Sequence, residues 1–375
     1  MKFDPDALET LVIKIGTSLL SGRRAFEGHV MESVVKEICA LKKDHRINVL
    51  IVSSGAIGCG MNTLKMTERP SALPDKQAVA AVGQATLMHY YETLFMTYGE
   101  GLHTAQVLLT LRDLDLRDSY LNVRNTIKNL FNMKSIIPIV NENDSTAVEQ
   151  LRFGDNDTLS AKIAAKLNAG LLIILSDIDG LYAGNPQKNP DAPHIPEVEE
   201  ITPEIIQYAG GAGTLTGTGG MRTKLDAARI AFAAGVPTII TNGHTPNVLH
   251  GVLSGEARCT HFKPAESALS HRKRWIAFGR TAQGTLKIDR GACDAIQTHG
   301  KSLLSAGITD STGHFHVGDA VEIRGEDGGL IARALVNYSS EDLRKIMGRQ
   351  SHEIAGILGA KLYDEVVHRD NLVLI

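Results

Sequence analysis

Six short apolar runs recur along the first 241 residues, and they constrain the fold more than any other feature. The runs are continuous rather than alternating and rich in β-branched residues: LVIKI (11–15), NVLIVS (48–53), AQVLLT (105–110), SIIPIV (135–140), LLIILS (171–176) and PTIIT (237–241). Such runs are typical of strands buried on both faces of a sheet. Between the first two, Val34, Ile38 and Leu41 recur at helical spacing. The alternation predicts an α/β domain with a largely parallel sheet and right-handed crossovers.

The alternation of apolar runs and helical segments ends near residue 255, which predicts a domain boundary there. The next segment, HFKPAESALSHRKR (261–274), is polar and basic, as expected of a linker. Beyond it lie short runs with partial alternation and Gly-rich turns: RWIAFG (274–279), GTLKID (284–289), DAVEIRG (319–325) and LIARALVNYS (330–339). These runs predict a small, mostly β domain. We therefore expect one domain at 1–260, a linker at 261–274 and a second domain at 275–375, and two domains suit a chain of 375 residues.

Composition excludes several classes of protein. Hydrophobic residues make up 43% and charged residues 22%, as in ordinary globular proteins, and the net charge of −3 gives no support for a nucleic-acid or membrane partner. The N-terminus has early acids and no apolar core, so we expect no signal peptide, and no apolar run approaches the ~20 residues of a membrane helix. The four scattered cysteines, Cys39, Cys59, Cys259 and Cys293, make a disulfide framework or zinc site improbable and favour a cytoplasmic location.

Two crowded polar clusters follow the run SIIPIV, namely NEND at 141–144 and GDND at 154–157. Asn, Asp and Gly favour turns, and this explanation suffices for either cluster alone. Together, the clusters would also supply acceptors for an ammonium and amide donors for a carboxylate. Ligands of open α/β sheets bind beyond the carboxyl ends of the strands, which is where the first cluster lies.

Glycines and lysines suggest a phosphate site at the same edge of the sheet. In KIGTS (14–18), Gly16 would let the backbone approach a phosphate, and Lys14 needs an anion unless it reaches solvent from a strand edge. The small residues of SSGAIGCG (53–60) also allow close approach. In GTGGMRTKL (217–225), glycine N–H groups and a helix N-terminus would favour an anion, although a surface loop would look similar. Neither the P-loop nor the dinucleotide-binding motif occurs, so we predict a kinase of another design.

Together these residues resemble the amino acid kinase family, and in particular its glutamate-phosphorylating branch. The matching pieces appear in the family's order across most of residues 10–260: VIKIGTS (12–18), VSSGAI (52–57), KQAVAAVGQ (76–84), VNEND (140–144), FGDNDTLSA (153–161), SDIDGLY (176–182) and TGGMRTK (218–224). The segment 275–375 resembles a PUA domain. The resemblance implies a three-layer sandwich carrying a small, mostly β domain.

The resemblance also implies roles for individual residues. Lys14 and Lys224 would contact the ATP phosphates and stabilise the transferring group, and Asp157 would orient both lysines. The glutamate-binding positions would be Ser54, Asn141, Asp144 and Asn156, with Asp144 accepting from the ammonium and the amides donating to carboxylate oxygens. The ATP-binding positions would be Lys14, Gly16, Ser176, Asp177, Thr218, Gly219, Gly220, Met221, Arg222, Thr223 and Lys224. Asn156 and Asp157 would point opposite ways from an extended loop.

The implied reaction converts ATP and L-glutamate into L-glutamate 5-phosphate and ADP, the first step toward proline, with feedback inhibition by proline. A free Glu carboxyl has a pKa of about 4.3, so the nucleophile needs no general base. Mg²⁺ would bind through phosphates and water, so we expect no protein metal site. We also expect a homo-oligomer, either a dimer or a tetramer.

Three alternatives remain open at this point. A kinase of the same fold could act on another carboxylate, a carbamate or a nucleotide. An RNA-binding protein is disfavoured because residues 270–375 hold 14 Lys+Arg against 13 Asp+Glu, which is nearly neutral. A non-catalytic regulator is disfavoured because Lys14, Lys224 and Asp157 are all present.

Overall fold

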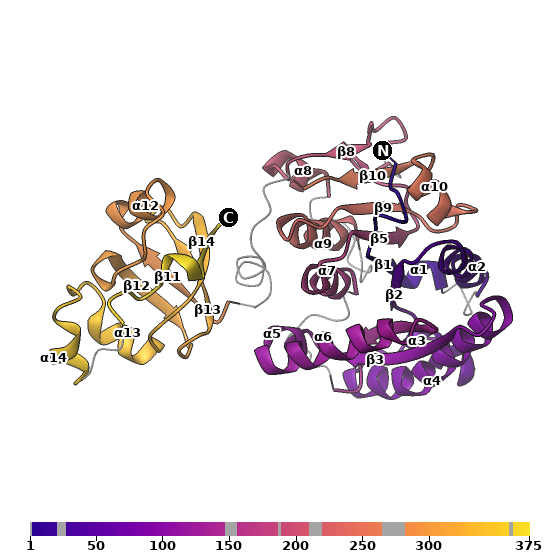
Figure 1. Cartoon of the computed structure of the whole chain (residues 1–375), viewed down its shortest axis with the longest axis horizontal. Helices are drawn as coiled ribbons and strands as arrows, with labels where there is room; N and C mark the ends of the chain where they lie inside the picture. The colour runs from indigo at the N-terminus through magenta and orange to yellow at the C-terminus, as the bar shows by residue number, and fades with distance from the viewer. Residues whose placement is uncertain are drawn as a thin grey trace. The chain divides into compact units, whose positions relative to one another are not determined.

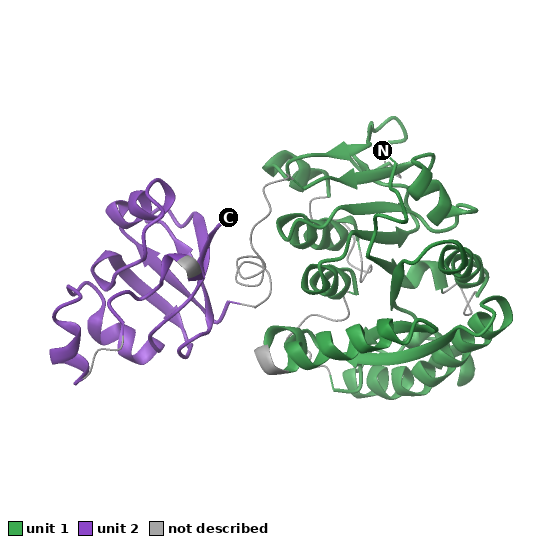
Figure 2. Cartoon of the chain, viewed as in Figure 1, with its two compact units in different colours: residues 1–267 green, residues 268–375 purple. Residues whose placement is uncertain are grey.

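The computed structural model describes residues 2–20, 28–146, 156–186, 189–209, 220–264, 282–359 and 363–375. The chain divides into two compact units, residues 1–267 and 268–375 (Figure 2). Each unit has its own hydrophobic core.

The first unit is built on an eight-stranded sheet, and all six apolar runs form strands in it. These strands are β1 (Thr10–Ile15), β2 (Asn48–Ser53), β3 (His103–Leu109), β4 (Ile136–Glu142), β5 (Leu171–Ser176) and β9 (Thr238–Asn242). The strand order is β3-β4-β2-β1-β5-β9-β10-β8, where β8 is Glu197–Val198 and β10 is Cys259–Phe262. Every neighbouring pair is parallel except β9 and β10. The predicted largely parallel α/β sheet is confirmed.

Helices cover both faces of this sheet (Figure 1). One face carries α1 (Thr17–Leu20), α2 (His29–Asp44), α4 (Leu73–Tyr98) and α10 (Val248–Ser254), and the other carries α7 (Asn156–Leu167) and α9 (Met221–Ala233). The remaining elements are α3 (Ala56–Thr63), α5 (Leu111–Asp115), α6 (Arg117–Asn132), α8 (Pro203–Tyr208) and a hairpin of β6 (Leu181–Tyr182) with β7 (His194–Ile195). The predicted three-layer arrangement is confirmed.

Strand alternation decides where the first lysine lies. On β1, Leu11, Ile13 and Ile15 belong to the core shared with α2 and α4. Successive side chains of a strand point to opposite faces, so Lys14 lies on the other face, beneath α7 and α9. A charged residue within a buried apolar run is thereby directed to one particular layer of the molecule.

The sheet extends two residues into the segment expected to be a linker. His261 and Phe262 belong to β10, where they pair with β9 and β8 and are buried. The neighbouring residues are polar, so this strand is not recognisable as an apolar run in the sequence. Residues 265–274 of the expected linker lie outside the described part of the chain.

The second unit is a mostly β domain, as predicted. Its sheet has the order β12-β11-β13-β14-β15, formed by β11 (Gly284–Ile288), β12 (Ile308–Gly313), β13 (Ala320–Arg324), β14 (Leu330–Leu335) and β15 (Leu372–Leu374). It also contains α12 (Arg290–Gln297), α13 (Ser340–Ile346), α14 (Ile354–Leu358) and the 3₁₀ turns Ser305–Gly307 and Arg369–Asn371. The run RWIAFG (274–279) lies outside the described residues. None of the helices in the described ranges is long and apolar enough to cross a membrane.

Candidate active site

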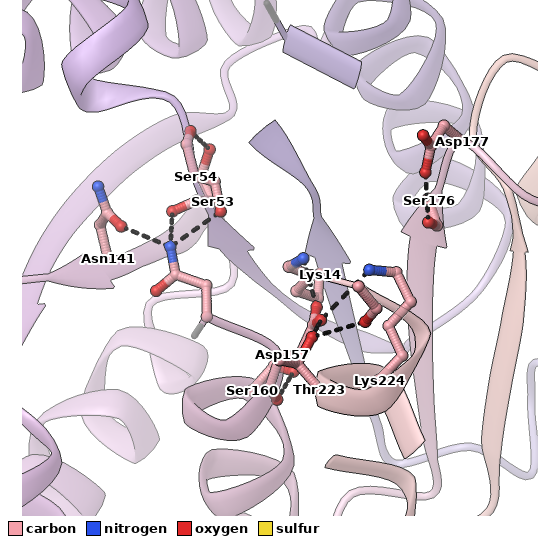
Figure 3. Close-up of polar contacts among 12 residues, drawn as sticks. Lys14, Ser53, Ser54, Asn141, Asp157, Ser160, Ser176, Asp177, Thr223 and Lys224 are labelled. Atoms are coloured by element: carbon pink, nitrogen blue, oxygen red, sulfur yellow. Dashed lines mark hydrogen bonds and ion pairs between the residues drawn. The ribbon is translucent and has the colours of Figure 1, made fainter. Parts of the chain in front are cut away.

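A buried cluster of three charged side chains lies at the carboxyl end of β1 (Figure 3). Lys14 forms an ion pair with Asp157 Oδ1, and Lys224 Nζ lies 3.4 Å from Asp157 Oδ2. Thr223 Oγ1 donates to the same Oδ2 at 2.9 Å. The cluster thus joins β1 with the first turns of α7 and α9, and it brings together the three residues expected to be catalytic.

The electrostatics of this cluster favour an anionic ligand. Lys14, Lys224 and Asp157 are only 5%, 6% and 0% exposed. Burial by itself would raise the pKa of the Asp157 carboxyl, but the ammonium groups of Lys14 and Lys224 outweigh that effect and lower the pKa below its ordinary value. One carboxylate therefore lies between two buried ammonium groups, an arrangement that favours binding of an anion.

A second cluster, made of amides and serines, lies where β2 and β4 end. The side-chain nitrogen of Asn156 has three acceptors, which are the Ser53 carbonyl at 3.1 Å, Ser54 Oγ at 3.0 Å and Asn141 Oδ1 at 3.0 Å. Figure 3 shows Ser53, Ser54 and Asn141 on one side of the Lys14 and Asp157 pair. Three of the four residues predicted to bind glutamate, Ser54, Asn141 and Asn156, therefore lie in one buried group.

The amide cluster continues to a residue that the sequence interpretation missed. Asn141 Nδ2 donates to Gln84 Oε1 at 2.8 Å. Gln84 is the last residue of the motif KQAVAAVGQ, and no function was predicted for it. Its position in the sequence could have indicated one. Gln84 is the polar member of a buried stripe on α4 that also contains Ala80, Leu87, Tyr91 and Phe95. A polar side chain at a core-facing helix position indicates a hydrogen-bonding function.

Asn156 was expected to donate a hydrogen bond to the substrate, but the atom of its side chain that lacks a partner is an acceptor. The two N–H groups of Asn156 already face three acceptors, so its side chain offers the acceptor Oδ1, which has no hydrogen-bond partner among the described residues. The missing partner suggests that Asn156 accepts from a ligand rather than donating to a carboxylate.

Asp144 lies in the turn after β4 and is partly buried. Burial raises the pKa of its carboxyl to about 6. A carboxylate in this position gains from a nearby cation, which would restore the ionised form. This property fits the expected role of accepting from an ammonium.

Asn156 and Asp157 lie in the first turn of α7 and not in an extended loop, so that expectation was wrong. Their side chains nevertheless reach different clusters, because successive residues of a helix point about 100° apart. Asn156 joins the amide cluster, and Asp157 joins the lysines.

The residues expected to bind nucleotide are only partly brought together. Ser176 ends β5, and its Oγ donates to Asp177 Oδ1 at 3.0 Å, apart from the lysine cluster. Arg222 pairs with Asp226 on its own helix at 3.3 Å. Gly220 precedes α9, Met221 begins it, and Thr218 and Gly219 lie outside the described residues.

Gly16 leaves little space above the end of β1. A Cβ atom at this residue would lie 3.2 Å from the Leu175 carbonyl oxygen and 3.4 Å from Lys14 Nζ. A side chain here would therefore crowd the ammonium group. Within the described ranges, no group of three His, Cys, Asp or Glu residues could hold a metal ion.

Comparisons with known proteins agree with these features. The sequence model of the "Amino acid kinase family" matches residues 9–242, and that of the "PUA domain" matches residues 284–358. The "Glutamate 5-kinase" of Caldanaerobacter subterraneus subsp. tengcongensis is 48% identical over 368 residues, covering 97% of each chain. Proteins of the same name from Carboxydothermus hydrogenoformans and a Picosynechococcus species are 48% and 47% identical, covering 97% and 98% of each chain. The chain therefore belongs to the amino acid kinase family, in its glutamate 5-kinase branch, and carries a PUA domain.

Proposed function

We propose that this chain transfers the γ-phosphoryl group of ATP to the γ-carboxylate of L-glutamate, giving L-glutamate 5-phosphate and ADP. The observation that carries the proposal is the meeting of two clusters at one sheet edge. A positively charged cluster suits phosphate oxygens, and an amide and carboxylate cluster suits an amino acid. The relatives named glutamate 5-kinase cover nearly the whole chain, which supports the same substrate.

In this mechanism, the chain supplies alignment and charge rather than a base. The glutamate γ-carboxylate is ionised at neutral pH and attacks without losing a proton. Lys14 and Lys224 stabilise negative charge on the transferring group, and Asp157 holds both ammonium groups in place. The Thr223 hydroxyl fixes the Asp157 carboxylate from the start of α9.

The nucleotide would lie along the lysine cluster. Gly16 would let phosphate oxygens approach β1, and Ser176, Asp177 and residues 218–224 would contact the remainder of ATP. Bound Mg²⁺ would supply neutralisation of charge on the phosphates. Since the Asp157 carboxylate is engaged by two lysines, the metal would be held mainly through phosphate oxygens and water.

The amino-acid end would be read by complementary polar atoms. Asp144 and the Asn156 Oδ1 atom accept from the α-ammonium, and the Ser54 hydroxyl donates to a carboxylate oxygen. Asn141 orients Asn156 through its side-chain oxygen.

The test is a set of parallel assays with Mg-ATP and four acceptors: glutamate, N-acetylglutamate, aspartate and UMP. We expect ADP release with glutamate to exceed that with each other acceptor by at least tenfold in kcat/KM. Comparable or faster turnover with another acceptor would refute glutamate as the substrate.

We further propose that proline inhibits by overlapping the glutamate pocket. Proline offers an α-carboxylate and a secondary ammonium, which Asp144 and Asn156 could read, but it has no γ-carboxylate to react. Raising glutamate should therefore weaken inhibition, and Asp144→Ala should impair both ligands. Inhibition that is independent of glutamate and unchanged in Asp144→Ala would place the proline site elsewhere.

The proposed chemistry belongs to the kinase domain, which we place at residues 1–260, joined through 261–274 to a PUA domain at 275–375. Every described residue with a proposed role lies in the first compact unit. The PUA domain would act on regulation or on assembly of a homo-oligomer.

A further inference from the structure

The amides of Asn156, Asn141 and Gln84 form a relay whose orientation is fixed by backbone groups. Asn156 must present its nitrogen to the Ser53 carbonyl, because a carbonyl oxygen only accepts. Asn141 must present its oxygen to the backbone N–H of Glu142, which only donates. The nitrogen of Asn141 then faces Gln84, so Gln84 must present its oxygen in return.

Because the oxygen of Gln84 accepts from Asn141, the nitrogen of Gln84 must point away from Asn141, at the end of this chain of amides. Gln84 is only 9% exposed, and its Nε2 atom has no hydrogen-bond partner among the residues that the structure describes. Leaving a buried donor unpaired is unfavourable, and buried polar groups in folded proteins almost always have a partner. Since the oxygen and nitrogen of one amide share a carbon, this donor lies beside the predicted amino-acid site.

Close packing between α3 and α4 positions Gln84 next to the amide cluster. A Cβ atom at the preceding residue, Gly83, would lie 1.8 Å from the Ala56 carbonyl oxygen on α3, and one at Gly60 would lie 1.9 Å from the Val79 carbonyl oxygen on α4. The two helices touch through backbone atoms at these positions. The next residue on α4 is Gln84, which this close packing places beside the start of α3.

We propose that Gln84 Nε2 binds the substrate directly, by donating to the carboxylate that does not react. This inference rests on the proposed function. The sheet order supports the choice of carboxylate: Lys14 is on β1, Ser54 follows β2, and Asn141, which Gln84 contacts, is on β4. Gln84 therefore lies at the end of the site away from the lysines, where the α-carboxylate of glutamate would be.

The decisive variant is Gln84→Glu. It keeps an oxygen that can accept from Asn141, and at the other end of the side chain it replaces the donor with an acceptor that is negatively charged at neutral pH. A lost hydrogen bond to a charged group raises KM by about ten- to a hundredfold, and repulsion between the new carboxylate and that of the substrate adds to this rise. We expect this rise in KM for glutamate, with KM for ATP unchanged and kcat within about threefold, because the reacting carboxylate is not the one affected. Gln297→Glu, an identical change at an exposed position of α12, is the control and should leave all constants unchanged.

A pH series separates direct binding from a structural role. The carboxyl introduced by Gln84→Glu regains a donor when it is protonated, so the ratio of its KM to the wild-type KM should shrink as pH falls from 8 to 5.5. In Gln84→Met, which has no donor at any pH, the same ratio should stay constant. Asp144 titrates alike in wild type and in the uncharged Gln84→Met, so its contribution cancels in that ratio.

Circular dichroism and thermal melting establish whether each variant is folded. If Gln84→Glu does not fold, the KM for glutamate is measured with Gln84→Met instead. If wild type phosphorylates glutamate and the folded variants keep its KM within twofold, Gln84 Nε2 serves a buried water molecule and the inference is overturned. If wild type does not turn over glutamate at all, the proposed function fails first and the assignment of Gln84 fails with it.

Discussion

Asp157 is the position at which a single substitution should have the largest physical consequence. The side chain is completely buried and compensates two ammonium groups that are themselves almost buried. Asp157→Asn preserves the size of the side chain but removes its charge. Breaking a buried ion pair by removing one partner costs about 3–5 kcal/mol, because the remaining charge is left uncompensated. We expect a loss in the free energy of unfolding at pH 7 within this range.

Urea denaturation followed by circular dichroism measures this loss, and the chain offers a matched control. Asp226→Asn removes a carboxylate from the pair with Arg222, in which both side chains are largely exposed on α9. Exposed pairs contribute only about 0–1 kcal/mol, so this variant should resemble wild type. The double variant Asp157→Asn with Lys14→Met should be more stable than Asp157→Asn alone, because one of the two stranded charges is removed.

The pH dependence gives a second check with a definite sign. The pKa of Asp157 lies below its ordinary value in the folded protein, so the carboxylate contributes stability above about pH 4. This contribution is lost only as pH falls through the lowered pKa. The stability difference between wild type and Asp157→Asn should therefore be constant from pH 8 to 5. A difference below 1 kcal/mol at pH 7, or one that disappears by pH 6, would refute the reasoning.

Four further predictions follow from individual contacts. Lys14→Ala and Lys224→Ala should each lower kcat by ~10²–10³ in steady-state assays, and near-normal kcat in both would contradict their role. Because the Asp144 pKa is raised to about 6, kcat/KM for glutamate should rise between pH 5 and 7, and Asp144→Asn should remove that contribution to the profile. Gly83→Ala places a Cβ atom 1.8 Å from a carbonyl oxygen of α3 and should cost about 1–3 kcal/mol in thermal unfolding, whereas Gly356→Ala, in open space, should not. A chain ending at residue 264 should retain glutamate-dependent ADP release, and a folded but inactive truncation would show that the PUA domain is required.

The central strands could be predicted because the residues of each strand by themselves show the apolar pattern of a buried strand. β1, β2, β4 and β5 are buried on both faces, and such strands are written as continuous apolar runs. β8 has only two residues, and β10 reads CTHF with two polar members, so neither differs clearly from a loop in sequence. Their pairing depends on the edge offered by β9, which is a tertiary property.

The sequence indicated which residues to consider at the candidate site, but not which of them would contact one another. Lys14, Asp157 and Lys224 come from three separate elements, and only folding shows that they share one ion-pair cluster. The donor role expected of Asn156 assumed that its nitrogen was available, whereas the Ser53 carbonyl already engages it. Composition cannot show which half of an amide is occupied, because this depends on backbone groups that the fold brings near.

The start of α7 explains how one short motif can serve both ends of the site. An acidic residue in the first turn of a helix is favoured by the helix dipole, so Asp157 is suited to this position even without the lysines. The preceding residue, Asn156, points about 100° away around the same turn and reaches the ends of β2 and β4. The separation between the amino-acid cluster and the phosphate cluster is then set by the geometry of a single helical turn. Because Asn156 and Asp157 share one helical turn, the reacting carboxylate would be held at a fixed place relative to Lys14 and Lys224, which is what the proposed mechanism of alignment requires.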